Sequence, residues 1–178
     1  MIKNTSDQYG WLAKFFHWLT LPVLILLFCL GLWMVELNYD ENWYDEAPYF
    51  HEGLGVLFAI LIMTRLGWRL YSQPPKLSAS LLFLEKKLAS ATHRLLYLLC
   101  ILLCITGYLI PTADGRALPV FDWFYIPSAG SFHFLQADIA GFLHHWVAWF
   151  TVCLVIIHSL AALKHHAINK DDTLKKIL

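Results

Sequence analysis

The sequence has little charge. Only 15% of its 178 residues are Asp, Glu, Lys or Arg, whereas 58% are hydrophobic and 16% are aromatic. An ordinary soluble domain carries about a quarter of charged residues. The apolar residues also fall in long blocks rather than in short alternating runs, so the composition favours a membrane protein over a soluble domain.

Three further absences narrow the functional classes. The net charge is zero, so no basic bias points to a nucleic-acid partner. The four cysteines form no CxxC pair, which argues against iron–sulfur and thiol-redox chemistry and for cysteines that pack as small hydrophobes. The N-terminus lacks a cleavable signal pattern, because the apolar run that follows is long enough to span. No internal repeat or second domain is visible, so we expect one domain over residues 1–178.

Four apolar blocks are long enough to cross a bilayer as helices, each having about 20 residues for some 30 Å of hydrocarbon. Pro22 lies inside the first block, where it is expected to kink the helix. The sequence therefore predicts an all-α membrane protein with a bundle of four transmembrane helices, at about residues 11–37, 50–71, 92–110 and 140–163.

Basic residues predict the orientation of the bundle. Four spans place both termini and the loop between the second and third spans on one side of the membrane. Of the 13 Lys and Arg residues, Arg116 alone falls on the other side. This asymmetry follows the positive-inside rule, so we expect both termini in the cytoplasm of a multi-pass protein of the bacterial inner membrane. Tryptophan and tyrosine gather near the ends of the spans, as expected for side chains in contact with membrane lipid.

The nine histidines are the unusual feature, because imidazole is costly in hydrocarbon. An interfacial location, exposed to water, explains His133, His165 and His166, and it also suits His93, which adjoins Arg94 at the inner end of the third span. The harder cases lie within spans or at their ends, and they are His17, His51, His144 and His158.

Spacing pairs these four histidines. His144 and His158 are 14 residues apart, which is about 40° short of four full turns, so they share a helix face about 21 Å apart along the axis. His145 points about 140° away from His158 and is the poorer candidate. By depth, His17 matches His158 on the cytoplasmic side and His51 matches His144 on the outer side.

Two neutral imidazoles that face each other inside a bundle suit axial ligation of haem iron. Two alternatives stay open. The four histidines could be buried groups that hydrogen-bond to backbone or hydroxyl groups, or they could bind zinc or copper, although such sites usually gather three or four ligands. The sequence has no CxxCH motif, so any haem would be bound non-covalently.

Arginines offer counter-charges for haem propionates. Arg65 and Arg69 are four residues apart on one face of the second span, where they could bind the propionates of the inner haem or anchor the helix at the membrane surface. Arg116 is the only cation available to the outer haem.

These residues resemble the bacterial cytochrome b561 family. The similarity covers nearly the whole chain and rests on FFHWL, PYFHEGLG, THRLLYLL, LHHW, IIHSLAALKHH and KDDTLKKI. It implies four transmembrane helices and two haem b groups that move electrons across the inner membrane. It further implies that His17 and His158 hold the inner haem and that His51 and His144 hold the outer one. The family leaves the role of His93 open, either near a quinone or near a propionate.

The predicted function is bis-histidine, outer-sphere electron transfer between a quinone pool and a partner or a small oxidant or reductant. Whether the chain is itself a quinone oxidoreductase enzyme is left open. Some relatives are associated with oxidation of superoxide at the outer face. The acidic outer loops of this chain would repel that anion and suit a periplasmic redox protein with a basic patch. The alternatives are a b-type haem anchor subunit of a larger oxidoreductase and a histidine-lined metal or proton transporter.

Overall fold

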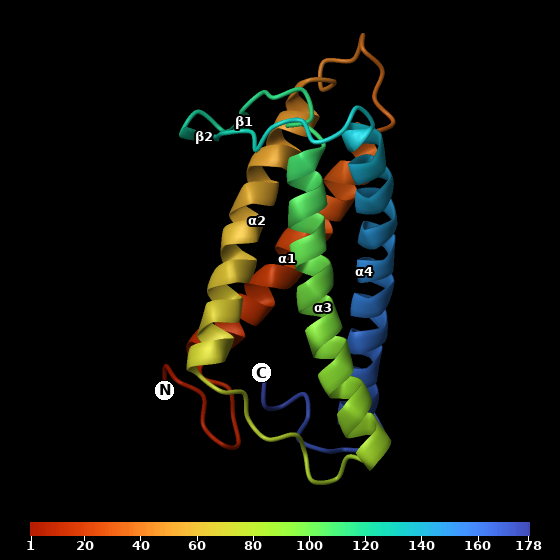
Figure 1. Ribbon diagram of the computed structural model, residues 1–178. Coiled ribbons are helices and arrows are strands. Elements are labelled where there is room, and N and C mark those ends of the chain that lie inside the picture. Colours follow the sequence, from red (N-terminus) through yellow and green to blue (C-terminus); the bar gives the residue numbers. More distant parts are fainter.

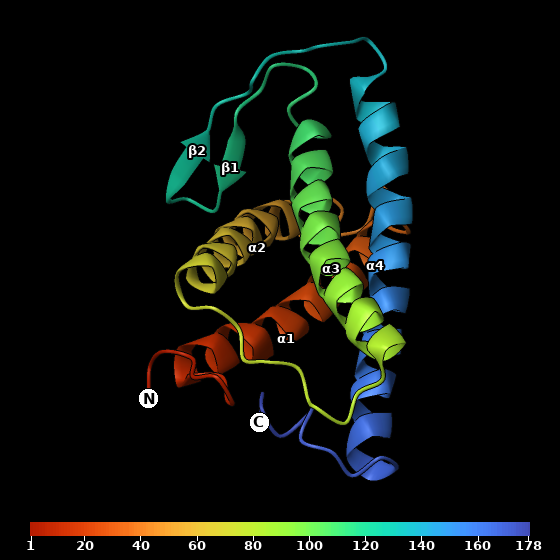
Figure 2. The same cartoon turned by 60° about the horizontal axis from the view of Figure 1, so that its bottom comes forward.

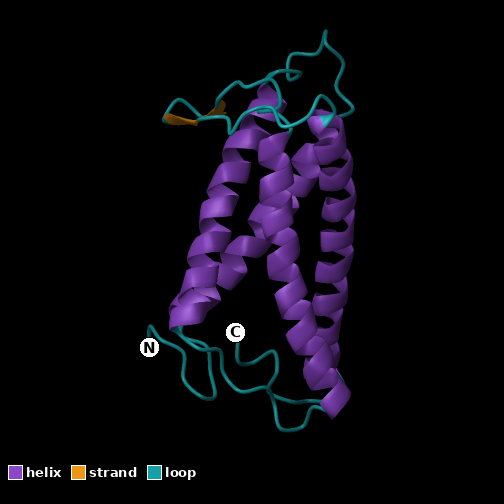
Figure 3. Ribbon diagram, in the orientation of Figure 1, coloured by secondary structure: helices purple, strands orange, loops and turns teal.

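The computed structural model describes all residues from Met1 to Leu178, and it consists mainly of four long helices (Figure 1). They are α1 (Trp11–Met34), α2 (Glu46–Tyr71), α3 (Phe83–Leu109) and α4 (Gln136–Ala167). Two short strands, β1 (Leu118–Val120) and β2 (Phe124–Ile126), lie between α3 and α4 (Figure 3). Each helix is long and apolar enough to cross a membrane. The prediction of an all-α chain with four such helices is confirmed, with one small hairpin added.

The two ends of the bundle differ. Both termini and the loop between α2 and α3 lie at one end, which we call the termini end, while β1 and β2 lie at the other, which we call the hairpin end (Figure 1). This arrangement follows from an even number of antiparallel helices. The two predicted histidine pairs can therefore lie at opposite ends of the bundle.

Three helices extend beyond the apolar blocks that predicted them. α2 begins at Glu46 rather than near residue 50, whereas α1 ends early, at Met34 rather than near residue 37. α3 begins at Phe83 rather than near residue 92, and α4 runs from Gln136 to Ala167 rather than from about 140 to 163. The added turns of α3 carry Glu85, whose carboxylate accepts a hydrogen bond of 3.0 Å from the Leu82 backbone N–H. Hydropathy marks only the hydrocarbon-facing part of a helix, and a polar, capped first turn continues the helix outside it.

The helices pack in sequence-adjacent pairs. α1 lies along α2, α3 lies along α4, and α2 contacts α3 (Figure 2). A small core fills the middle of the bundle between them, and its buried members are Leu24, Leu27, Phe58, Ile62, Cys100 and Leu103. Large apolar side chains elsewhere point outwards, as with Ile157, which is 62% exposed. Such an apolar exterior suits a lipid environment.

A close backbone contact attaches the hairpin to α2. β1 and β2 pair antiparallel, and the turn between them holds Phe121 at a positive φ of 49°. The Phe121 ring lies against Gly53 of α2, where an added Cβ would come within 3.0 Å of the ring. Glycine allows this close contact, because a Cβ at position 53 would force the Phe121 ring to shift.

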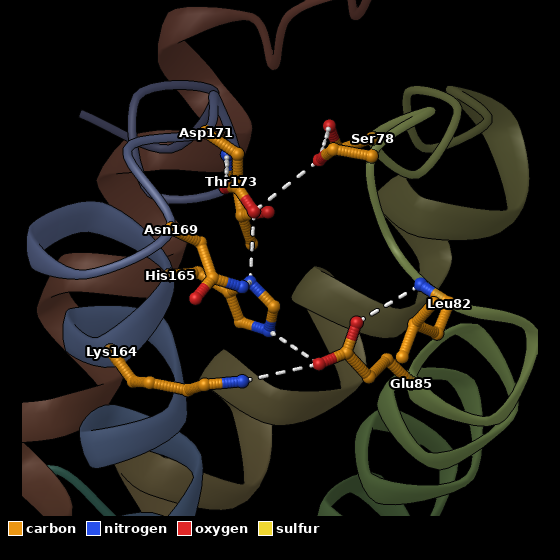
Figure 4. A network of polar contacts seen from close by, with 9 residues as sticks. Ser78, Leu82, Glu85, Lys164, His165, Asn169, Asp171 and Thr173 are labelled. Atoms are coloured by element: carbon orange, nitrogen blue, oxygen red, sulfur yellow. Dashed lines mark hydrogen bonds and ion pairs between the residues drawn. The ribbon is translucent and has the colours of Figure 1, made fainter.

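The chain after α4 folds back under the termini end, where Figure 4 shows a polar network. The His165 imidazole lies 2.8 Å from Asp171 Oδ2 and 3.8 Å from Glu85 Oε1, and Lys164 pairs with the same Glu85 oxygen at 3.2 Å. His165 is only 8% exposed, so its expected place in interfacial water is wrong. The reason is the returning tail, which covers the imidazole and supplies its carboxylate partner.

Further contacts hold the last residues of this tail. The Trp18 indole of α1 donates to the Ile177 carbonyl at 3.0 Å, and Lys176 Nζ donates to the Lys76 carbonyl at 2.8 Å. Asp171 also accepts a backbone hydrogen bond from Thr173 at 2.9 Å. The tail thus closes the termini end of the bundle, beneath His17 and His158.

Candidate functional site

The termini-end cavity has a volume of about 470 Å³ and contains three imidazoles from three helices. The ring centroids of His17, on α1, and His158, on α4, are 6.5 Å apart. His93, on α3, has its ring centroid 5.2 Å from that of His158. The structure therefore brings together the predicted inner pair and adds His93 as a close neighbour.

The hairpin-end cavity has a volume of about 260 Å³ and contains the other predicted pair. The ring centroids of His51, on α2, and His144, on α4, are 6.1 Å apart. His145 is exposed and packs edge-on against Trp146, outside this cavity. The helical phase that set His145 apart in the sequence accounts for this difference.

Glycines make room for the hairpin-end imidazoles. A Cβ added at Gly31 of α1 would lie 3.1 Å from His51 Cε1, and one added at Gly107 of α3 would lie 3.1 Å from His144 Cε1. In each helix pair, a glycine of the first helix receives the imidazole of the second. Each ring is thereby held against a backbone and directed across the cavity.

A hydroxyl group orients one of these rings. Thr106 Oγ1 donates to the Leu102 carbonyl at 2.7 Å, so its oxygen is left to accept, and His144 Nδ1 lies 3.0 Å from it. This contact assigns the proton of neutral His144 to Nδ1 and leaves Nε2 free as a metal ligand. Nδ1 of His51, by contrast, is buried without a hydrogen-bond partner.

The separation within each pair fits one metal ion between two imidazoles. A metal–nitrogen bond of about 2 Å, plus roughly 1 Å from ring nitrogen to ring centroid, gives about 6 Å between centroids. The observed values are 6.5 Å and 6.1 Å. No group of three or more His, Cys, Asp or Glu side chains converges as a metal cage. Two-ligand axial binding of haem iron therefore fits these residues better than a zinc or copper site.

Two arginines of α2 face the termini-end cavity. The guanidinium groups of Arg65 and Arg69 lie over the ring of Tyr97, 5.4 Å and 5.7 Å from its centroid. Arg65 Nη2 is 2.9 Å from His17 Nδ1. Because a guanidinium only donates, Nδ1 of His17 is the acceptor in this contact. The Trp68 indole N–H, also at this cavity, is buried without a partner.

The two cavities carry opposite charge. The termini-end cavity is lined by Arg65, Arg69, Lys76 and Lys176 and by no Asp or Glu side chain. The hairpin-end cavity has a single charged residue in its lining, Glu52. Arg116 does not line this cavity, and its assignment to the haem at the hairpin end stays a prediction.

Arg116 is held instead in its own loop. Its Nε donates to the Pro111 carbonyl at 2.7 Å and lies 3.7 Å from Asp114 Oδ2.

Sequence reasoning missed Tyr97 and Thr106 as site residues, because their contacts join helices that are distant along the chain. The position of Thr106 beside Gly107, within the third apolar block, is the sequence feature that could have indicated it as a site residue.

Comparison with known proteins supplies the family. A family model described as "Prokaryotic cytochrome b561" matches residues 8–178. The chain is 45% identical over 175 residues to "Cytochrome b561 homolog 2" of Escherichia coli (strain K12), covering 98% of this chain and 93% of that protein. It is 28% identical over 173 residues to "Probable superoxide oxidase CybB" of Yersinia pestis, covering 96% of each. The chain therefore belongs to the prokaryotic cytochrome b561 family, and it is a multi-pass membrane protein for which the family implies haem b.

Proposed function

We propose that this protein carries single electrons across the bacterial inner membrane through two haem b groups, between a quinone and a redox partner at the opposite face. His17 and His158 would hold one haem at the termini end, and His51 and His144 would hold the other at the hairpin end. The proposal rests on one observation. In each of the two cavities, two histidine rings from different helices face each other, with ring centroids 6.5 Å apart at the termini end and 6.1 Å apart at the hairpin end.

Haem iron supplies reversible one-electron redox chemistry, and the protein supplies its ligands, its position and its electrostatic surroundings. Two imidazoles per iron leave no open coordination position, which favours outer-sphere transfer over oxygen binding. Leu24 lines both cavities. The two cavities therefore adjoin at this side chain, which favours electron transfer between them.

Arg65 supports the termini-end assignment through its chemistry. When Nε2 of neutral His17 binds a metal, Nδ1 carries the proton and can no longer accept from a guanidinium. Arg65 must then turn to an anion, yet no Asp or Glu side chain lines this cavity. Neither Arg65 nor Arg69 has a carboxylate within 4.0 Å. The two propionates of haem b are suitable anions, and the unpartnered Trp68 N–H adds a third donor.

The basic residues support a cytoplasmic termini end. Lys and Arg side chains at this end outnumber those at the hairpin end by 12 to one, as follows: Lys3, Lys14, Arg65, Arg69, Lys76, Lys86, Lys87, Arg94, Lys164, Lys170, Lys175 and Lys176 against Arg116. Positive charge is retained on the cytoplasmic side of inner-membrane proteins. The hairpin end would then face the periplasm.

The hairpin end favours a cationic partner. Nine of the 13 acidic residues belong to this end, namely Glu36, Asp40, Glu41, Asp45, Glu46, Glu52, Asp114, Asp122 and Asp138. The only Lys or Arg at this end, Arg116, is paired with Asp114. A relative carries the name "Probable superoxide oxidase CybB", but a field of this sign slows the approach of an anion such as superoxide. A periplasmic redox protein with a basic patch suits this surface, with a quinone as the lipid-soluble partner.

A reduced-minus-oxidised difference spectrum of the purified protein, combined with extraction and counting of haem, tests the proposal. We expect a sharp α-band and two haems per chain. His17→Ala and His158→Ala should lose the same haem, and His51→Ala and His144→Ala should lose the other. His145→Ala is the matched control and should keep both.

Two results would contradict this function, and a third would change one ligand assignment. Absence of haem would favour a metal or proton transporter. Obligatory co-purification with a catalytic subunit would favour an anchor subunit. Loss of the termini-end haem in His93→Ala but not in His17→Ala would reassign the inner ligand.

A further inference from the structure

The hairpin formed by β1 and β2 has one buried face and one exposed face. Successive side chains of a strand point to opposite faces, and the register pairs Leu118 with Ile126 and Pro119 with Tyr125. Leu118 is 3% exposed, and with Ile126 it lines the hairpin-end cavity. Tyr125, on the other face, is 68% exposed, and Trp123 in the turn is 69% exposed. The hairpin is thus a wall of the cavity whose outer face bears uncovered aromatic side chains.

Contacts with α2 fix the level of the hairpin along the bundle. The Phe121 ring lies against Gly53, and its centroid is 6.0 Å from that of Tyr49 and 6.2 Å from that of Phe50. All three partners lie near the start of α2, a helix long and apolar enough to span a membrane. The hairpin is therefore level with the end of this span, where it extends sideways from the bundle rather than along its axis (Figure 1).

Backbone chemistry suits this hairpin to the surface of a bilayer rather than to its interior. A two-stranded sheet leaves N–H and C=O groups unpaired along both outer edges, and hydrocarbon offers such edges no partner. The headgroup layer supplies water and polar groups. Tryptophan and tyrosine are enriched at this depth, because an apolar ring carries a polar N–H or O–H.

The charge of the hairpin also favours lipid over a charged protein partner. Asp122 is the only charged side chain in residues 118–126, and its carboxylate accepts a hydrogen bond from the Tyr49 hydroxyl at 3.4 Å. The outer face is otherwise neutral and aromatic. A redox protein with a basic patch would find its complementary charge on the acidic loops of the hairpin end instead.

We propose that the β1–β2 hairpin binds the surface of the bilayer. Trp123 and Tyr125 lie among the phospholipid headgroups at the hairpin end, and this contact holds Leu118 and Ile126 in place as a wall of the hairpin-end cavity. The lipid contact requires no haem, so it holds or fails independently of the proposed function.

Two labelling measurements on the purified full-length protein in phosphatidylcholine nanodiscs test the contact. A phosphatidylcholine with a photoreactive headgroup reports contact with lipid, and hydroxyl-radical oxidation reports contact with water; mass spectrometry locates both. We expect Trp123 and Tyr125 to crosslink to the lipid and to be oxidised several-fold more slowly than Tyr39. Tyr39 is the matched control, because it is 87% exposed in the loop between α1 and α2, which extends beyond the hairpin along the bundle axis (Figure 1).

A variant tests whether lipid contact holds the cavity wall. Tyr125→Ser should accelerate hydrogen exchange of the backbone amides of residues 118–126 in the same nanodiscs, roughly tenfold for the loss of one aromatic contact. Tyr125→Phe, which keeps the ring, and Tyr39→Ser, which changes a side chain in another loop, should leave this exchange slow. Unchanged exchange of the four helices shows that each variant is folded.

Fast oxidation of Trp123 and Tyr125 without lipid crosslinks would place the hairpin in water and overturn the inference. Slow oxidation without crosslinks would overturn it as well, because protein, such as a second copy of this chain, would then cover the hairpin. Equal exchange in Tyr125→Ser and the wild type would show that lipid does not hold the wall. The labelling uses the wild-type chain, so it decides the lipid contact even if a variant does not fold.

Discussion

Substitution of Thr106 by valine isolates the group that orients His144, one of the proposed haem ligands. The two side chains have nearly the same shape, and Thr106 is only 6% exposed, so the exchange leaves packing almost unchanged. It removes the oxygen that lies 3.0 Å from His144 Nδ1. The Nδ1–H group is then buried without an acceptor, and the ring loses the contact that sets its tautomer.

The size of the effect follows from that single contact. A buried donor that loses its acceptor costs about 1–3 kcal/mol. At about 1.4 kcal/mol for each factor of ten, this corresponds to roughly 5- to 150-fold in binding. Loss of a group that orients a metal-bound histidine typically costs 10- to 100-fold in affinity. We therefore expect Thr106→Val to weaken retention of the hairpin-end haem by about 10- to 100-fold and to leave the termini-end haem unchanged.

A matched control lies on α4. Thr151 is fully buried, and its hydroxyl donates to the Val147 carbonyl at 2.6 Å, but it forms no hydrogen bond with a histidine. Both variants are stripped of haem and titrated with haemin, and the fraction bound at each site is followed by its α-band. The reasoning is refuted if Thr106→Val binds the hairpin-end haem as tightly as the wild type, or if Thr151→Val weakens it equally.

Three further outcomes are expected. Gly31→Val should expel the hairpin-end haem, because a Cβ there already lies 3.1 Å from the imidazole that packs against it, whereas Gly67→Val, with nothing within 4 Å, should not; haem counting distinguishes them. His93→Ala should retain two haems but shift the termini-end α-band, and loss of a haem would instead make His93 a ligand. Hydrogen bonds to the Asp171 carboxylate outweigh its burial and hold its pKa below the usual value, so its stabilisation is complete above about pH 4 and is lost as the pH falls further. Asp171→Asn should accordingly lower the thermal unfolding temperature at neutral pH and reduce the difference from wild type in acid; equal curves at both pH values would contradict the role of the His165 contact.

At the termini end, two histidines compete as the ring that faces His158. His158 has two imidazole neighbours, and His93 is the nearer by ring centroid, at 5.2 Å against 6.5 Å for His17. The longer separation is the one that leaves room for a metal ion between the rings. The shorter one suits a ring that lies beside the pair.

Local properties of the sequence determined the number of spanning helices and the distribution of charge between their ends. Hydropathy acts on each segment separately, because every span must meet the same hydrocarbon thickness. The spacing of His144 and His158 is likewise a property of one helix. These features need no knowledge of neighbouring helices, and they suffice to nominate four ligands in two pairs as a prediction.

Contacts between helices were decided only by the tertiary structure. The approach of Gly107 to His144 and the placing of Arg65 against His17 each join residues far apart in the chain. Their distances depend on how the helices lean and cross, which periodicity does not encode. His165 shows the same limit, because its burial depends on a tail that folds back across the end of the bundle. The sequence by itself determined which residues belong to the four long apolar helices and towards which end of its helix each histidine lies, because both follow from each helix alone. Only the packing of the four helices decided which of them face one another across a cavity.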